Sequence, residues 1–112
     1  MEINWTKEFN SAVTICDVEG KIIYMNDKAA AMFSKDGGYE LVGKCLFECH
    51  TERSNDIIKD LIRNGKTNSY TIEKNGIKKL IFQSPWYQNG KVMGLVEISH
   101  EIPFDMPHHV RS

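Results

Sequence analysis

Apolar and polar residues alternate along a short stretch near the start of the chain. Residues 12–16 show this alternation, as half-buried strands do, and residues 21–25 supply an apolar partner strand. Between them lies the sequence Asp-Val-Glu-Gly, in which Gly20 suits the left-handed position of a tight turn. The pattern predicts two antiparallel strands joined by this turn.

Two helices are predicted in the middle of the chain. The first begins after Asn26, whose side-chain oxygen can accept a hydrogen bond from the first turn. Its apolar face consists of Ala29, Met32 and Phe33. The second runs from an N-cap at Thr51 to about Asn64, and Gly65 ends it. Its apolar face consists of Ile57, Ile58, Leu61 and Ile62. Residues 41–50, between the helices, are predicted as one irregular helical turn broken near glycine 43.

Three strand signals complete the pattern. Residues 70–73 alternate in polarity, and Asn-Gly at 75–76 is a strong signal for a two-residue hairpin. Residues 77–87 form a long strand, in which Pro85 requires a bulge or an edge position. A second Asn-Gly, at 89–90, leads into a last strand over residues 92–102.

The predicted elements divide the chain into three parts. Residues 1–11 form an amphipathic lead-in helix, residues 12–102 form one α+β domain, and residues 103–112 form a tail. The apolar side of the lead-in consists of Ile3, Trp5 and Phe9. Prolines at 103 and 107 prevent a continuous exit helix. We therefore expect a free-standing domain, or a piece of a longer protein.

The order strand, turn, strand and Ala-rich helix within residues 12–33, followed by three later strands, resembles a PAS sensory domain. The resemblance extends to about Ile102. It implies a five-stranded antiparallel sheet in the order 2-1-5-4-3, with helices on one face. PAS domains are receivers and dimerisation modules without a reaction of their own. The resemblance therefore implies a sensory or signalling module that binds a small ligand, another protein, or both, and that forms a homodimer. Because no exit helix is expected, the output of this sensor would pass to a separate signalling protein.

Composition excludes several other classes of protein. The 112 residues suffice for one domain, and 41% hydrophobic with 26% charged residues is near the globular average. Net charge is −1, with Lys and Arg scattered among Asp and Glu, so no nucleic-acid partner is expected. No apolar run approaches the roughly 20 residues of a spanning helix and no signal peptide is present, which predicts a cytoplasmic protein without membrane contact. No catalytic motif is recognisable, so no enzymatic activity is expected.

The resemblance implies a ligand cleft between residues 41–64 and the inner face of the sheet. Candidate lining residues are Cys45, Phe47, His50, Ile57, Leu61, Phe82 and Val96. The inward-facing set of strand 77–87 stays open because Pro85 can shift it. Glu97 alternates with Val96 and is predicted to face water.

Haem is one alternative occupant of this cleft. PAS proteins that bind haem use a His from the helical side, and the imidazole of His50 suits iron, which would make the chain a gas or redox sensor. The other interpretation is that His50 only supports the start of the helix. Covalent attachment is not expected, because Cys45 and Cys49 have one more residue between them than Cys-x-x-Cys-His requires.

Flavin binding and thiol chemistry are two further possibilities for the same segment. Gly43, Cys45 and Phe47 partly resemble the flavin-binding motif, but Leu46 replaces the phosphate-binding Arg and Val96 replaces the flavin-contacting Gln, so flavin is not expected. A thiol redox switch at Cys45 or Cys49 is a further alternative. A structural zinc site requires four ligands, and the sequence has no second Cys pair to supply them. The plainer interpretation is that the cysteines pack as small apolar residues.

Overall fold

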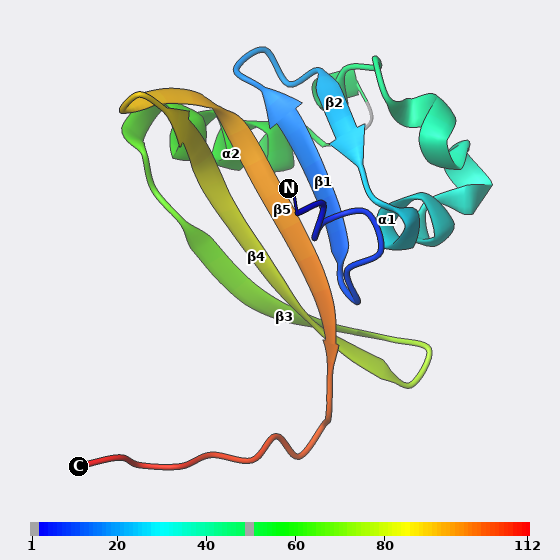
Figure 1. The fold of residues 1–112 in the computed structure, drawn as a ribbon, viewed down its shortest axis with the longest axis vertical. Helices are drawn as coiled ribbons and strands as arrows, with labels where there is room; N and C mark the ends of the chain where they lie inside the picture. Colours follow the sequence, from blue (N-terminus) through cyan, green and yellow to red (C-terminus); the bar gives the residue numbers. More distant parts are fainter. Residues whose placement is uncertain (1–2, 49–50) are drawn as a thin grey trace.

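The computed structural model describes residues 3–48 and 51–112 (Figure 1). Its main elements are β1 (Ala12–Asp17), β2 (Ile22–Met25), α1 (Asp27–Met32), α2 (Glu52–Asn64), β3 (Asn68–Lys74), β4 (Ile77–Gln88) and β5 (Lys91–Ile102). Three short 3-10 helices, Ser34–Asp36, Gly38–Leu41 and Leu46–Glu48, lie between the two α-helices. The strands form one antiparallel sheet in the order β2-β1-β5-β4-β3, which confirms the predicted fold.

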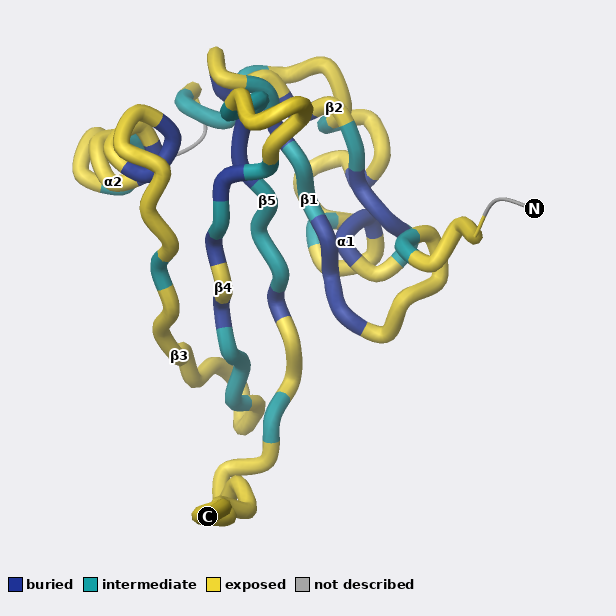
Figure 2. Tube along the Cα trace, turned by 60° about the vertical axis from the view of Figure 1, so that its left-hand side comes forward, coloured by how far each residue is buried: buried dark blue, intermediate teal, exposed yellow. Residues whose placement is uncertain are grey.

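The sheet separates two unequal layers. In Figure 1, α2 lies behind β4 and β5, whereas the N-terminal segment passes in front of the sheet. Figure 2 shows the strands side by side, with α2 on the left near β3 and the N-terminus on the right beyond β2. We call the side that carries α2 the inner face and the other side the outer face. Strand β3 is exposed along nearly its whole length because it is an edge strand (Figure 2).

Both Asn-Gly hairpins form as predicted. Asn75 and Gly76 have φ values of 54° and 77°, and Asn89 and Gly90 have 52° and 79°. Two consecutive positive φ angles give the tight turn whose twist matches antiparallel strands, and Asn and Gly tolerate them best. These turns fix the register of the long β3-β4-β5 meander. Lys74 lies opposite Ile77 at the first turn, and Gln88 lies opposite Lys91 at the second.

Pro85 lies close to both features predicted as alternatives for it, an unpaired edge and a bulge. The pairing of β3 with β4 ends at Asn68 and Gln83, so β4 extends past the end of its edge neighbour before it reaches the proline. The pairing of β4 with β5 also shifts register immediately afterwards, between Trp86 and Tyr87. A residue without a backbone N–H is tolerated at such a place because the chain has no ladder partner there on the β3 side.

The core consists of two clusters on the inner face. One comprises Cys16, Ile58, Leu61, Ile62 and Leu95, with Leu46, Phe47 and Val92 packed around it. The other comprises Ala12, Ile22, Met25 and Ala29, with Phe33, Leu41 and Leu46 around it. Leu46 contacts both clusters. The first fixes α2 on the sheet and the second fixes α1, so the segment between the helices is left to span the space between them.

The predicted lead-in helix is wrong for residues 3–11. These residues form an irregular segment with one turn, closed by a hydrogen bond of 3.2 Å from the Phe9 N–H to the Thr6 carbonyl. The carbonyls of Thr6 and Lys7 also accept hydrogen bonds from the side chain of Asn26 and the backbone of Asp27. Because these acceptors bind the start of α1, they are not used to continue a helix, and such short helices have little stability of their own.

The segment between the α-helices also departs from its prediction. Instead of one broken turn over residues 41–50, short 3-10 helices end at Leu41 and restart at Leu46. Gly43, with φ 96°, lies between them, and Lys21 pairs with Cys45 in an isolated β-bridge. Three backbone hydrogen bonds therefore join this segment to the chain at the start of β2: from Gly43 to Ile22, from Ile22 to Lys44, and from Leu46 to Gly20.

Candidate functional site

A cavity of about 430 Å³ lies on the inner face, between the sheet and the segment that joins the α-helices. Its apolar walls are Ile22, Met25, Phe33, Leu41 and Leu46. Its polar lining residues are Thr14, Asp36, Lys44 and Glu97. A concave, mostly apolar space with a few convergent polar groups is the usual form of a small-molecule site.

A second hollow of about 300 Å³ adjoins the first beneath α2. Its lining residues are Ser54, Ile57, Ile58, Asn68, Tyr70, Gln83 and Glu97. Glu97 lines both hollows, so its side chain marks the place where they meet. We call the two hollows together the inner cleft.

Strand pairing explains which side chains reach the inner cleft. Thr14 lies opposite Glu97 on β5, and Glu97 lies opposite Gln83 on β4. Side chains directly opposite each other in an antiparallel sheet share one face. These three polar residues therefore form a row across the floor of the inner cleft. The prediction that Glu97 faces away from the fold, into water, is wrong.

Polar contacts hold the floor in position near α2. The Asn68 Nδ2 group donates a hydrogen bond of 3.0 Å to Oε1 of Gln83, which is a buried residue. Burial, and secondarily the negative charge of Glu97, raises the pKa of Tyr70 above its ordinary value. Because Tyr70 lines the second hollow, the negative charge of Glu97 acts electrostatically there as well.

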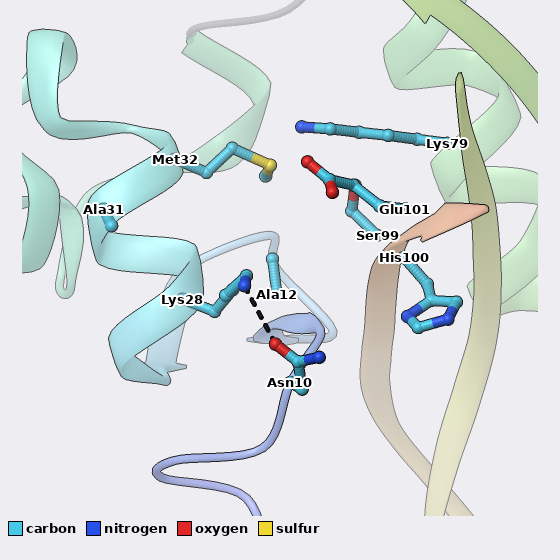
Figure 3. Close-up of a pocket in the computed structure, with 9 residues that line it drawn as sticks. All are labelled: Asn10, Ala12, Lys28, Ala31, Met32, Lys79, Ser99, His100 and Glu101. Atoms are coloured by element: carbon cyan, nitrogen blue, oxygen red, sulfur yellow. Dashed lines mark hydrogen bonds between the residues drawn. The ribbon is translucent and has the colours of Figure 1, made fainter. Parts of the chain in front are cut away.

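A third hollow, of about 320 Å³, lies apart from the inner cleft beside α1 (Figure 3). Lys79 and Glu101 project from the ends of β4 and β5 on one side, and Met32 faces them from α1. Lys28 donates a hydrogen bond of 2.9 Å to Oδ1 of Asn10 at its lower edge. Its charged, mostly exposed lining makes it a surface groove rather than an apolar cleft.

Five of the seven predicted cleft residues belong to the helical side, and the structure describes four of them. Leu61 is buried in the core, Ile57 lines the second hollow, and Cys45 lies at the β-bridge with its Sγ 3.8 Å from the Glu19 carbonyl. The Phe47 ring packs against Gly20, where an added Cβ would lie 2.5 Å from a ring carbon. His50 lies outside the described residues.

The two predicted sheet residues, Phe82 and Val96, lie on the outer face. Gln83 and Glu97 line the inner cleft, and adjacent residues of a strand point to opposite faces. The inner face of β5 carries Leu95, Glu97 and Ser99, whereas Val96 and Ile98 lie on the outer face. Because Gln83 and Glu97 point inward, a rule that places apolar residues inside selects their apolar neighbours instead. The one signal in the sequence for the cleft floor was a glutamate, Glu97, between two apolar residues of the same strand.

The cysteines differ in their surroundings. Cys16 is buried, and burial raises the pKa of its thiol from 9.0 to about 11, so it forms little of the reactive thiolate near neutral pH. Cys45 is partly exposed, and both are free thiols. Cys49 lies outside the described residues, so the thiol switch stays a prediction, as does haem ligation by His50. Among residues 3–48 and 51–112, no three His, Cys, Asp or Glu side chains gather to hold a metal ion.

No protein-family model matches this sequence, and no curated protein matches it. Solved structures match it through their fold. The PAS domain of the histidine kinase ThkA is 17% identical, with a TM-score of 0.64, and the match covers 80% of this chain and 97% of that domain. A Vibrio cholerae receptor described as a dual PAS-heme oxygen sensor is 18% identical, with a TM-score of 0.64 over 83% of this chain and 95% of that one. This chain has a PAS fold.

A longer protein also contains this PAS fold. The Vibrio cholera VqmA structure, a complex with ligand and DNA, is 15% identical with a TM-score of 0.70, and the match covers 87% of this chain. The chain spans only 48% of the VqmA chain in that structure. The solved PAS folds thus include parts of sensory and signalling proteins, some of them ligand-bound. In the described part of this chain, no helix combines the length and apolar character needed to cross a membrane.

Proposed function

We propose that this chain is a non-catalytic sensory module that binds one small, largely apolar molecule in the inner cleft. The observation that carries the proposal is the cavity of about 430 Å³ between the sheet and the joining segment, with apolar walls and a polar floor. Binding would shift the balance between two packings of this segment against the sheet, which is how a ligand signal can leave the domain. The PAS fold of sensor proteins supports the same interpretation.

Native mass spectrometry of the full chain, purified without denaturant, tests this proposal. We expect a fraction of the protein to carry one non-covalently bound small molecule. Thr14→Leu would fill the cleft floor and should remove most of that adduct. Thr71→Leu is the matched control, because Thr71 is exposed and its neighbour Tyr70 lines the inner cleft, so Thr71 points to the outer face. A wild-type protein without adduct, or an adduct unaffected by Thr14→Leu, would contradict the proposal.

We further propose that the module forms a homodimer and passes its signal to a separate protein in the cytoplasm. Apolar side chains on the outer face support the dimer, because Phe82 is 37% exposed and lies opposite Ile98 on the neighbouring strand. Trp5 and Phe9 are 56% and 43% exposed, and they pack edge to face with ring centroids 5.2 Å apart. Exposed apolar groups of this kind are typical of protein contacts. The near-neutral charge favours a protein over nucleic acid as the partner.

A further inference from the structure

The floor of the inner cleft carries a carboxylate at its centre. We infer that Glu97 selects ligands that present a protonated amine at one end of an otherwise apolar body. This inference rests on the proposed function, since it names the chemistry of the molecule that the cleft would bind. It concerns recognition and involves no reaction.

The position of Glu97 gives it access to a ligand in either hollow. It projects from β5, the central strand of the sheet, and lines both the larger cavity and the hollow beneath α2. Pairing with β1 and β4 on both sides holds its backbone in place. A polar group on a rigid strand is better suited to fix a ligand's orientation than one on a loop.

The surroundings of Glu97 favour a donor over an acceptor. Five apolar side chains form the walls of the larger cavity, which leaves room for an apolar ligand body. Two carboxylates, of Glu97 and Asp36, line this cavity with a single cation, Lys44, so an anionic ligand would meet net repulsion. A hydrogen bond from a charged nitrogen to a carboxylate is about twice as strong as a neutral one.

The neighbours of Glu97 in the polar row suit the same ligand. Thr14 lies beside it in the larger cavity and offers a hydroxyl that can accept a second hydrogen bond from an amine. Gln83 lies on its other side, and its Oε1 is engaged by Asn68. A donor nitrogen placed between Thr14 and Glu97 would therefore meet oxygen acceptors on the β1 side of the row, with the apolar body against the walls of the larger cavity.

Three indole compounds with side chains of similar length separate these possibilities: tryptamine, which is an amine, tryptophol, which is an alcohol, and indole-3-acetate, which is an acid. Isothermal titration calorimetry on the full wild-type chain should give affinities in this order, with tryptamine about tenfold tighter than tryptophol. Glu97→Gln should reduce tryptamine binding to the level of tryptophol and change tryptophol binding little. Glu101→Gln is the matched control, because Glu101 lies on the same strand but lines the third hollow.

The possible outcomes separate the two claims. If wild-type protein binds tryptophol but shows no preference for tryptamine, or if Glu97→Gln keeps the preference, the inference is overturned while the proposed function stands. If none of the three compounds binds and native mass spectrometry finds no adduct, both are overturned. Even if Glu97→Gln does not fold, the order of affinities in the wild-type protein shows whether the cleft prefers the amine. Nuclear magnetic resonance spectra of both variants establish whether their fold is intact.

Discussion

Asn26 shows how one side chain can connect several segments. It is completely buried, and its Oδ1 accepts hydrogen bonds of 2.9 Å from the backbone N–H groups of Val13 and Ala29. Its Nδ2 donates to the carbonyls of Thr6 and Ser11, at 2.9 Å and 2.8 Å. The side chain thus caps α1 and also links the N-terminal segment to β1. Only the capping contact could be predicted from the sequence, because the other three depend on how the chain folds back.

Asn26→Ala should be strongly destabilising. The substitution leaves several buried backbone groups without a partner, and each such group costs about 1–3 kcal/mol. We expect the free energy of unfolding, measured by urea denaturation, to fall by at least about 3 kcal/mol. Asn10→Ala is the matched control, because Asn10 is exposed and its Oδ1 accepts a hydrogen bond from the exposed side chain of Lys28. A loss below about 1 kcal/mol for Asn26→Ala would mean that the network is not needed.

Cys16 gives the protein a dependence of stability on alkaline pH. Its thiol pKa is raised from 9.0 to about 11 in the folded state, so between these values the unfolded chain loses a proton that the folded chain keeps. The free energy of unfolding therefore falls as pH rises through this range, by up to about 2–3 kcal/mol. Below pH 9 the contribution is fully present.

Denaturation curves at pH 8 and pH 11 test this dependence. The loss of stability between the two pH values should be smaller for Cys16→Ala than for the wild-type protein. Cys45→Ala, at a partly exposed thiol, should lose as much as the wild-type protein does. Equal losses in all three proteins would show that Cys16 is not the group that titrates.

Among the elements, β1 and β5 pair at Gly94 in a geometry that leaves no room for a side chain. A Cβ at this position would lie 1.8 Å from the Cys16 carbonyl oxygen, and φ is 153°, where side chains are rarely found. The gap is too small for any other residue. The strand pairing between Asp17 and Gly94, and the hydrogen bond of 3.0 Å from Trp86 Nε1 to the same carbonyl, depend on this space.

Gly94→Ala should therefore separate the two strands. We expect a loss of more than about 3 kcal/mol in the free energy of unfolding, from the clash and the unfavourable φ together. Gly76→Ala is the control, because Gly76 also has a positive φ of 77° but has no atom within 4 Å of an added Cβ. It should lose only about 1 kcal/mol. If the two variants lose the same amount, the close approach contributes nothing.

Local sequence signals predicted most helices and strands, but they did not predict which side chains of β4 and β5 face the inner cleft. The caps of α2 are confirmed: Thr51 Oγ1 accepts from the Ser54 N–H at 3.2 Å, and Gly65 ends the helix in a left-handed conformation. Such features depend on neighbouring residues alone. The facing of β4 and β5 depends on the whole sheet. Since Glu97 faces inward between apolar neighbours that face outward, alternation alone could not identify the cleft floor.

On the scale of the whole molecule, the outer face should make the homodimer. We expect size-exclusion chromatography with light scattering to give the mass of a dimer for the wild-type protein. Phe82→Glu places a charge among apolar side chains of this face and should yield a folded monomer. Ile57→Glu is the control, because Ile57 is similarly exposed, at 43%, but lies on α2. A monomeric wild-type protein, or a dimer unaffected by Phe82→Glu, would contradict this proposal.

The fold persists at identities of 15–18% to the solved structures compared above. Such distant sequences retain the same sheet because hairpins and apolar faces, rather than individual residues, specify it. The polar floor of the inner cleft is where chains of one fold can differ, since Thr14 and Glu97 belong to neither core cluster. In the proposed function, the choice of ligand therefore depends on side chains such as Thr14 and Glu97.

Amide chemical shifts measured by nuclear magnetic resonance during a titration with tryptophol test the inner cleft most directly. Binding there should shift the amides of Thr14, Leu46 and Glu97, which line the larger cavity, and leave those of Thr71 and Lys74 on the exposed edge strand unchanged. Saturable shifts confined to the cleft are the expected result. Shifts confined to the outer face or the edge strand, or none at all, would contradict a ligand-binding cleft on the inner face.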